Sequence, residues 1–105
     1  MTPQDARHIT TQLTTLLDDI GVAYTRRDVY GNTFLKLEPF DKTIRIGDAA
    51  IDERFRYRYN VMTTHDHYDR STKQFFYQPA SWRRLRDQLI KDVARGHRHV
   101  STCSR

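Results

Sequence analysis

The spacing of hydrophobic positions changes along the chain, and each change predicts a different kind of element. Near the start of the chain, apolar residues recur every three or four positions, which is the spacing of one buried helix face. Thr2 and Pro3 are residue types that begin helices, and Gly21 is a type that ends them. A second helical stripe follows Pro79 and is predicted to end at Gly96. Its apolar members are Trp82, Leu85, Leu89, Ile90 and Val93.

Between the two helices the apolar spacing shortens to every second residue, which predicts strands. Residues 22–30 and 33–38 flank Gly31-Asn32, a pair suited to a hairpin turn because glycine accepts a positive φ. A short strand is expected at residues 43–47, and a short aromatic strand at residues 74–78. The stretch between the last two strands is polar and is predicted to be a connection.

Residues 54–61 have the strictest alternation. Every second residue is aromatic or apolar, and every intervening residue is Arg or Asn. In a strand, these two sets point to opposite sides of the sheet. The pattern therefore predicts that Phe55, Tyr57, Tyr59 and Val61 lie in the core, and that Arg54, Arg56 and Arg58 lie on the other face.

These elements predict an α+β fold with the order helix, five-stranded antiparallel meander, helix. Each helix has a single apolar stripe, so both are expected to pack on one face of the sheet and to leave the opposite face open to solvent. Residues 1–96 form one predicted domain of common size. Residues 97–105 are predicted to be a disordered basic tail, because they are polar and aperiodic.

Composition narrows the class of protein. Hydrophobic residues make up 37% of the 105 residues and aromatic residues 11%, which is typical of a globular domain rather than a disordered chain. No apolar run approaches the roughly 20 residues that a membrane helix needs, and no signal region is apparent. We therefore expect a cytoplasmic protein with no membrane partner. Cys103 is the single cysteine, so an internal disulfide is excluded.

The positive charge is concentrated in the second half of the chain. The net charge is +5, and residues 51–105 carry twelve Lys or Arg against six Asp or Glu. Most of the cations are Arg, whose planar guanidinium suits phosphate and carboxylate groups. This asymmetry indicates an anionic partner. The alternative is an ordinary Arg-rich surface that only keeps the protein soluble.

Arginines on the predicted open sheet face are the first candidate binding site. Nucleic-acid backbone or an acidic protein surface would neutralise four neighbouring guanidiniums there, with an exposed aromatic residue beside them. The alternative is that acids on adjacent strands, Asp28, Glu38 and Asp41, neutralise them. The candidate residues are Arg45, Arg54, Arg56, Arg58 and Phe76.

The second helix carries a further candidate surface. Arg84, Lys91 and Arg95 recur at helical spacing on its exposed side and are secondary candidates for partner binding. The alternative is an ordinary solvated helix face, since Asp87 and Asp92 balance part of the charge.

Residues 64–69 contain the only close cluster of metal-ligand residue types. The run Thr64-His65-Asp66-His67-Tyr68-Asp69 resembles the start of the metallo-β-lactamase motif, T-H-x-H-x-D-H. Arg70 stands where that family has His, and the scaffold of that family needs about twice this length. A metal site on His65, His67 and Asp69 with His97 and His99 is one interpretation of this cluster, and a plain polar loop is the other; the lack of a cysteine ligand favours the loop. We predict no metal, no cofactor and no catalytic residues.

A second resemblance concerns the whole chain. Its small size, its helix–strands–helix order and the segment Lys42-Thr43-Ile44-Arg45-Ile46-Gly47-Asp48 followed by residues 54–61 resemble small orphan proteins of phages and mobile elements. That loose class includes anti-CRISPR-type inhibitors, which act in the cytoplasm of the host cell. Many such inhibitors mimic DNA with an acidic surface, whereas this chain is basic.

These observations lead to two functional expectations. The first is a non-enzymatic binding protein, an inhibitor of a bacterial defence system of the anti-CRISPR type, whose basic surface contacts a protein effector or nucleoprotein complex with an anionic surface. The alternative is a small nucleic-acid-binding module that uses an Arg-rich open sheet face.

Overall fold

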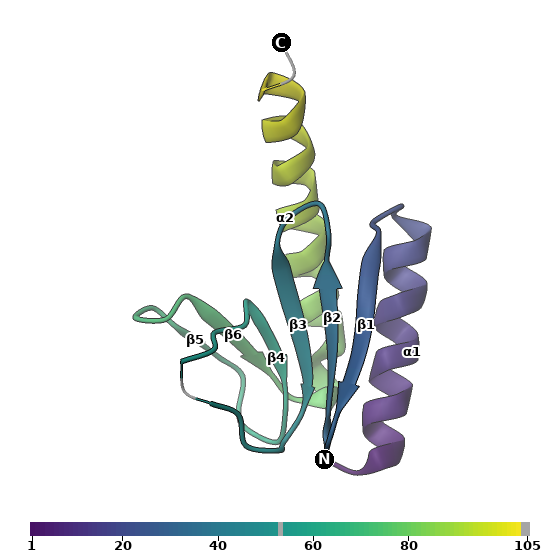
Figure 1. Cartoon of the computed structure of the whole chain (residues 1–105), viewed down its shortest axis with the longest axis vertical. Helices are drawn as coiled ribbons and strands as arrows, with labels where there is room; N and C mark the ends of the chain where they lie inside the picture. The colour runs from purple at the N-terminus through teal and green to yellow at the C-terminus, as the bar shows by residue number, and fades with distance from the viewer. Residues whose placement is uncertain (53, 104–105) are drawn as a thin grey trace.

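The computed structural model describes residues 1–52 and 54–103, with side chains described up to Gly96. The described residues form two α-helices, a short 3-10 helix and six strands (Figure 1). In chain order these are α1 Pro3–Asp19, β1 Tyr24–Val29, β2 Asn32–Leu37, β3 Lys42–Gly47, β4 Tyr59–Val61, β5 His67–Asp69, β6 Gln74–Tyr77, η1 Pro79–Ser81 and α2 Trp82–Cys103.

Over the described residues the strands form one mixed sheet in the order β1-β2-β3-β4-β6-β5. The first three strands are antiparallel neighbours, and β5 pairs antiparallel with β6. In contrast, β4 is parallel to both β3 and β6. The predicted α+β class is confirmed, whereas the five-stranded antiparallel meander is wrong. Parallel neighbours need a long connection, and residues 48–58, hereafter the crossover, supply it between β3 and β4.

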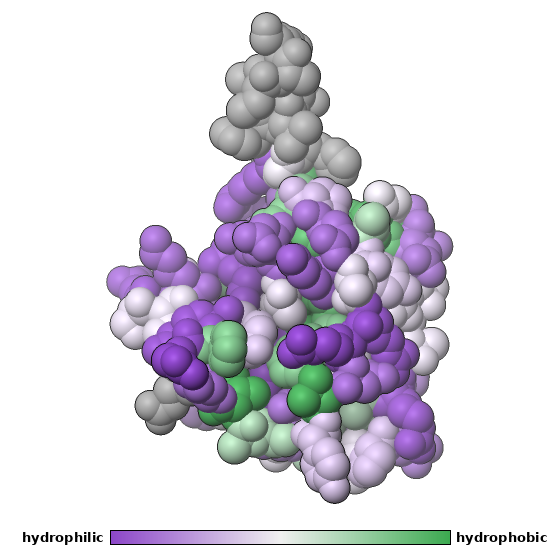
Figure 2. All heavy atoms as spheres, viewed as in Figure 1, coloured by the Kyte–Doolittle hydropathy of each residue, from purple (hydrophilic) through white to green (hydrophobic). Residues whose placement is uncertain are grey.

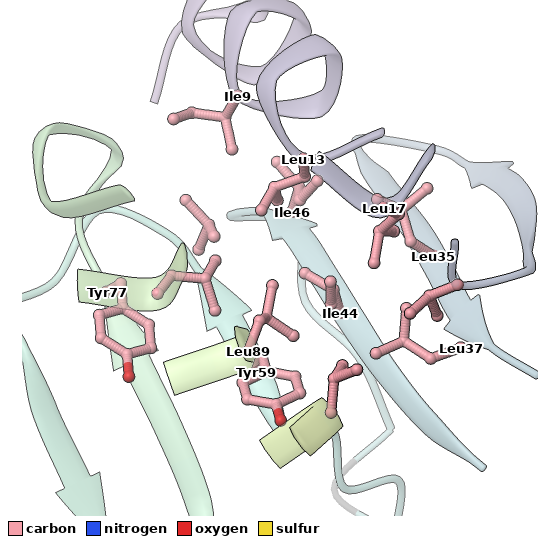
Figure 3. Packing of buried hydrophobic residues seen from close by; sticks show 14 residues of the cluster. Ile9, Leu13, Leu17, Leu35, Leu37, Ile44, Ile46, Tyr59, Tyr77 and Leu89 are labelled. Carbon is pink, nitrogen blue, oxygen red and sulfur yellow. The ribbon is translucent and has the colours of Figure 1, made fainter. Parts of the chain in front are cut away.

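One hydrophobic core joins both helices to one face of the sheet (Figure 3). Leu35, Leu37, Ile44 and Ile46 alternate along β2 and β3 onto this face and are at most 1% exposed. Side chains of α1 and α2 fill the other side of the cluster. Figure 1 shows α2 passing behind β2 and β3, with α1 near β1. The helical members are Ile9, Leu13, Leu17, Leu85, Leu89 and Val93.

The predicted start of α1 is confirmed in detail. The Thr2 hydroxyl accepts a hydrogen bond from the Asp5 amide at 3.1 Å, and the Asp5 carboxylate accepts one from the Thr2 amide at 3.4 Å. This reciprocal cap satisfies amides that the first helical turn leaves unpaired.

The predicted end of the second helix at Gly96 is wrong, because α2 continues to Cys103. Gly96 lies against the Phe40 ring, and a Cβ at this position would come within 2.1 Å of a ring carbon. The glycine therefore serves close packing rather than helix termination. The predicted disordered tail at residues 97–105 covers the last part of α2 and two residues outside the described part of the chain. Its disorder stays a prediction.

The predicted strand at 54–61 is only partly present, because β4 contains Tyr59–Val61 alone. In the residues just before β4, side chains rather than a neighbouring strand form hydrogen bonds with the backbone. The Tyr57 amide donates to the Gln74 side chain at 3.1 Å, and the Asn60 side-chain amide donates to the Tyr57 carbonyl at 3.1 Å. These bonds leave the preceding backbone outside the sheet.

The consequences for the predicted core are mixed. Tyr59 and Val61 are buried in it, as predicted. Phe55 is 55% exposed, and Tyr57 packs on Phe34, which points to the face away from the helices. The crossover thus covers part of the face that was predicted to be open. A further difference is β5, a strand within the stretch predicted to be a polar connection.

No helix among the described residues combines the length and the apolar composition needed to cross a membrane.

Candidate nucleic-acid interface

The three parallel strands begin at the same edge of the sheet, and each start carries a cation. Lys42 opens β3, Arg58 immediately precedes β4, and Lys73 immediately precedes β6. Because parallel neighbours run in one direction, these residues meet at one edge instead of alternating between two. A depression of about 250 Å³ there is lined by all three together with Arg56.

A second depression adjoins the first and extends it toward α2. It has a volume of about 460 Å³ and lies between the β2–β3 turn and α2, where Phe40 and Gly96 meet. Lys42 and Arg58 line both depressions, and Arg95 lines the second. We call the combined depression the basic groove. Its cationic residues are Lys42, Arg56, Arg58, Lys73 and Arg95.

Arg58 is held in place at the centre of the basic groove. Its guanidinium lies 4.7 Å above the Phe75 ring and donates to the Lys73 carbonyl at 3.2 Å. One of its nitrogens lies 3.7 Å from the Asp92 carboxylate. Burial acts to lower the pKa of Arg58, but Asp92 and the Tyr59 hydroxyl outweigh it and raise that pKa. Arg58 is therefore a fixed positive charge rather than a mobile one.

Asp92 links this centre to α2. It accepts a hydrogen bond from the Tyr59 hydroxyl and another from the Gln88 amide at 2.9 Å. Burial, followed by this bond to Asp92, raises the pKa of Tyr59 far above its usual range, so its hydroxyl stays protonated and donates.

The remaining cations of the basic groove have no acidic partner among the described residues. No ion pair there includes Lys42, Arg56, Lys73 or Arg95. Within the described part of the chain, Arg56 donates only to the neighbouring Phe55 carbonyl, at 3.1 Å. Five cations and two carboxylates, Asp41 and Asp92, line the described part of the groove, which leaves an excess of three positive charges. This excess favours an anionic ligand.

Arg45 does not belong to this surface, contrary to the sequence-based expectation. It is 6% exposed and lies beneath the crossover. Its guanidinium donates to the Asn32 side chain at 3.3 Å and to the Ala49 carbonyl. Burial lowers the pKa of this guanidinium. Arg45 therefore anchors the crossover to β2 and β3 instead of facing a partner.

The other predicted residues divide in the same way. Arg56, Arg58 and Arg95 line the basic groove, whereas Arg54, Phe76, Arg84 and Lys91 do not. Arg54 pairs with Asp52 at 2.7 Å, and Arg84 pairs with Asp66 at 3.3 Å. The Phe76 ring stacks on His67 with centroids 4.5 Å apart. The predicted four-arginine stripe is therefore wrong as a single surface.

Lys42 and Lys73 were not among the predicted site residues. Each stands directly before or at the start of a strand and after a turn residue, which is a visible signal in the sequence. That signal predicts a shared site only if β3 and β6 run parallel. In an antiparallel meander the starts of neighbouring strands alternate between opposite edges.

The His65–Asp69 cluster forms a hairpin arm. Its carboxylates accept structural hydrogen bonds: Asp66 from the Gln78 amide at 2.9 Å, and Asp69 from the Ser71 amide at 3.0 Å. The His65 and His67 rings lie 5.0 Å apart. Over the described residues, no group of three His, Cys, Asp or Glu side chains could hold a metal ion. The side chains of His97 and His99 lie outside the described residues.

Figure 2 shows the sheet face that α2 leaves uncovered. Hydrophilic side chains (purple) cover most of it, and separate hydrophobic areas (green) show between them. Comparison of the chain with protein-family models, curated proteins and solved structures finds no match in any of the three.

Proposed function

We propose that this chain is a non-enzymatic binding protein whose basic groove holds the sugar–phosphate backbone of a nucleic acid. The observation that carries the proposal is the convergence of cations at the starts of three parallel strands, most of them without an acidic partner in the described residues. Phosphates that these cations neutralise release condensed counterions, and that release drives nonspecific nucleic-acid binding.

The lining of the groove supports phosphate as the ligand. Thr43 and Thr72 hydroxyls and the Gln74 amide stand among the cations, and such groups commonly contact backbone oxygens. The groove also consists of two adjoining depressions that share Lys42 and Arg58, and this elongated form suits an extended chain. A cytoplasmic location without a membrane partner belongs to the same proposal.

The expected role as an inhibitor of a bacterial defence system stays a prediction. A nucleoprotein effector would present the same phosphate chemistry to the groove.

The test is a salt titration of binding to a labelled single-stranded oligonucleotide, followed by fluorescence anisotropy. Five phosphate contacts predict a slope of log affinity against log salt of about −3.5, and each lost contact reduces its magnitude by about 0.7. Lys73→Gly is the sharpest variant, because Lys73 has a φ of 58° that glycine adopts without strain. It removes one charge and is expected to fold as well as the parent.

Arg70→Gln is the matched control. Arg70 is an exposed residue at the start of the same β5–β6 turn, but it does not line the groove. We expect Lys73→Gly to weaken binding and flatten the slope more than Arg70→Gln does. Equal effects of the two variants would show that only overall charge matters, and the groove would lose its role.

A further inference from the structure

A third depression lies beside the basic groove, on the sheet face away from the helices. Its volume is about 470 Å³, within the range of small-molecule pockets. Thr43 and Tyr57 line both this depression and the basic groove, so the two are continuous. We call it the aromatic pocket. Its lining residues are Thr25, Arg27, Phe34, Lys36, Glu38, Thr43, Phe55 and Tyr57.

The strand register explains why these residues share one face. Arg27 lies opposite Phe34, and Thr25 lies opposite Lys36, which in turn lies opposite Thr43. Residues directly opposite each other in antiparallel strands point to the same side. The crossover then brings Phe55 and Tyr57 over this patch, and Arg45 holds the start of the crossover against the sheet.

The pocket presents aromatic rings in a partly open arrangement. Tyr57 packs on Phe34 with ring centroids 5.1 Å apart, and Phe34 is 9% exposed. Phe55, in contrast, keeps 55% of its surface in contact with solvent. An exposed phenyl ring at the rim of a pocket offers a flat apolar surface that a second ring could cover.

Charged groups surround these rings. The Arg27 guanidinium lies 5.9 Å from the centre of the Phe34 ring, and Lys36 forms only a long, exposed ion pair of 3.8 Å with Asp41. Glu38 is the acid of the pocket, and one of its oxygens accepts a hydrogen bond from the Thr25 hydroxyl. A carboxylate is an acceptor only, so it selects ligand groups that donate.

We propose that the aromatic pocket takes one unpaired base of a single-stranded nucleic acid whose backbone lies in the basic groove. This inference rests on the proposed function. The base stacks against Phe55 and Tyr57 and is flanked by Arg27 and Lys36, while Glu38 accepts a hydrogen bond from an exocyclic amino group of the base. Cytosine, adenine and guanine carry such a group and thymine does not, so the pocket prefers these bases to thymine, and cytosine is the pyrimidine that tests this preference. A duplex keeps its bases stacked inside and cannot offer one.

The experiment compares equal-length labelled oligodeoxycytidine, oligodeoxythymidine and a mixed-sequence duplex by fluorescence anisotropy. Phe55→Ala should weaken binding of single-stranded oligodeoxycytidine by about 5- to 150-fold, the range measured for loss of one base-stacking ring. Its salt slope should stay that of the parent, because no phosphate contact is lost. Phe55→Leu keeps apolar bulk without a flat ring and should show the same weakening.

Two further variants sharpen the result. Tyr30→Ala is the matched control, because Tyr30 is a fully exposed aromatic residue outside the pocket. It should bind as the parent does. Glu38→Gln should lower the ratio of oligodeoxycytidine affinity to oligodeoxythymidine affinity. Removing one negative charge strengthens binding of both oligonucleotides alike, so this general effect does not change the ratio.

The outcomes separate the two proposals. If Lys73→Gly weakens binding while both Phe55 variants match Tyr30→Ala, the pocket is not a base site and the groove keeps its role. If Phe55→Ala weakens duplex and single strand equally, the pocket does not select an unpaired base and the inference is also overturned. If no oligonucleotide binds and an acidic peptide does, the proposed function itself is wrong.

Discussion

Gly96 shows how much the shape of the basic groove depends on single side chains. The Phe40 ring, from the turn before β3, fills the space that a side chain at position 96 would occupy. Two opposing effects therefore meet at this residue. Alanine is favoured over glycine inside a helix by about 1 kcal/mol, but here its methyl group would overlap a ring carbon.

We expect the sign of the Gly96→Ala substitution to depend on Phe40. In the parent, Gly96→Ala should lower the free energy of unfolding by about 1–3 kcal/mol, the usual range for overpacking. In a Phe40→Ala background the same substitution should instead be neutral or stabilising. Urea unfolding of the four proteins of this double-mutant cycle measures both values. A destabilisation that is equal in the two backgrounds would show that the ring contact is not the cause.

Two polar residues, Asn60 and Arg45, show why alternation along a strand did not predict which polar side chains are exposed. The alternation puts Asn60 on the same side of the strand as the arginines, but Asn60 is 1% exposed and donates to the Tyr57 carbonyl. Arg45 was likewise expected on an open face and is buried beneath the crossover. A period of two separates the sides of a strand but does not say which side is covered. Only the path of the chain over the sheet decides that.

At the scale of elements, local patterns predicted well and pairing direction did not. Both helices and the three strands of the first half were expected close to their positions, because capping residues and spacing determine them locally. The β1–β2 hairpin was also expected, although its turn residues are Tyr30 and Gly31. Parallel pairing of β4 depends on contacts across the crossover, which a local pattern does not contain.

The hydrogen bond from Tyr59 in β4 to Asp92 in α2 connects the sheet to the helix, and its contribution to stability should depend on pH. Burial raises the pKa of Tyr59 in the folded protein above its unfolded value of about 10. Its contribution to stability is therefore complete below pH 10 and is lost as the pH rises further. The pKa of Tyr77 is raised to about 12, also mainly by burial, so it adds to the same trend.

The free energy of unfolding should fall in both proteins when the pH is raised from 8 to 11. We expect this fall to be about 1.4 kcal/mol smaller in Tyr59→Phe than in the parent. At pH 8 the variant should be less stable by about 1 kcal/mol, because Asp92 loses a donor. Urea unfolding at the two pH values gives both numbers. Tyr30→Phe, at a fully exposed position, is the control and should follow the parent. An identical pH trend in Tyr59→Phe and the parent would contradict the assignment.

At the scale of the whole molecule, the candidate site exists only because distant segments meet. The start of β3, the end of the crossover and the β5–β6 turn each contribute cations to it. Arg56, Arg58 and Arg95 could be named from the sequence as basic candidates. Their grouping with Lys42 and Lys73 could not, since it follows from the parallel sheet. The separation of Arg45, Arg54, Arg84, Lys91 and Phe76 from them follows instead from the path of the crossover and from side-chain contacts such as the pair of Arg84 with Asp66.

The same parallel sheet has a consequence for the order of folding. Strands β1 to β3 form one unit of local hairpin contacts, and β5 with β6 forms another. These contacts close short loops, whereas β4 must bridge the two units across the crossover, which costs more loop entropy. We therefore expect the amides of β4 to exchange with deuterium faster than those of β2, as measured by native-state hydrogen exchange. An oligonucleotide in the basic groove would contact both units and should slow this exchange. Ligand binding would then stabilise the pairing of β4 with β3 and β6, which we expect to form last.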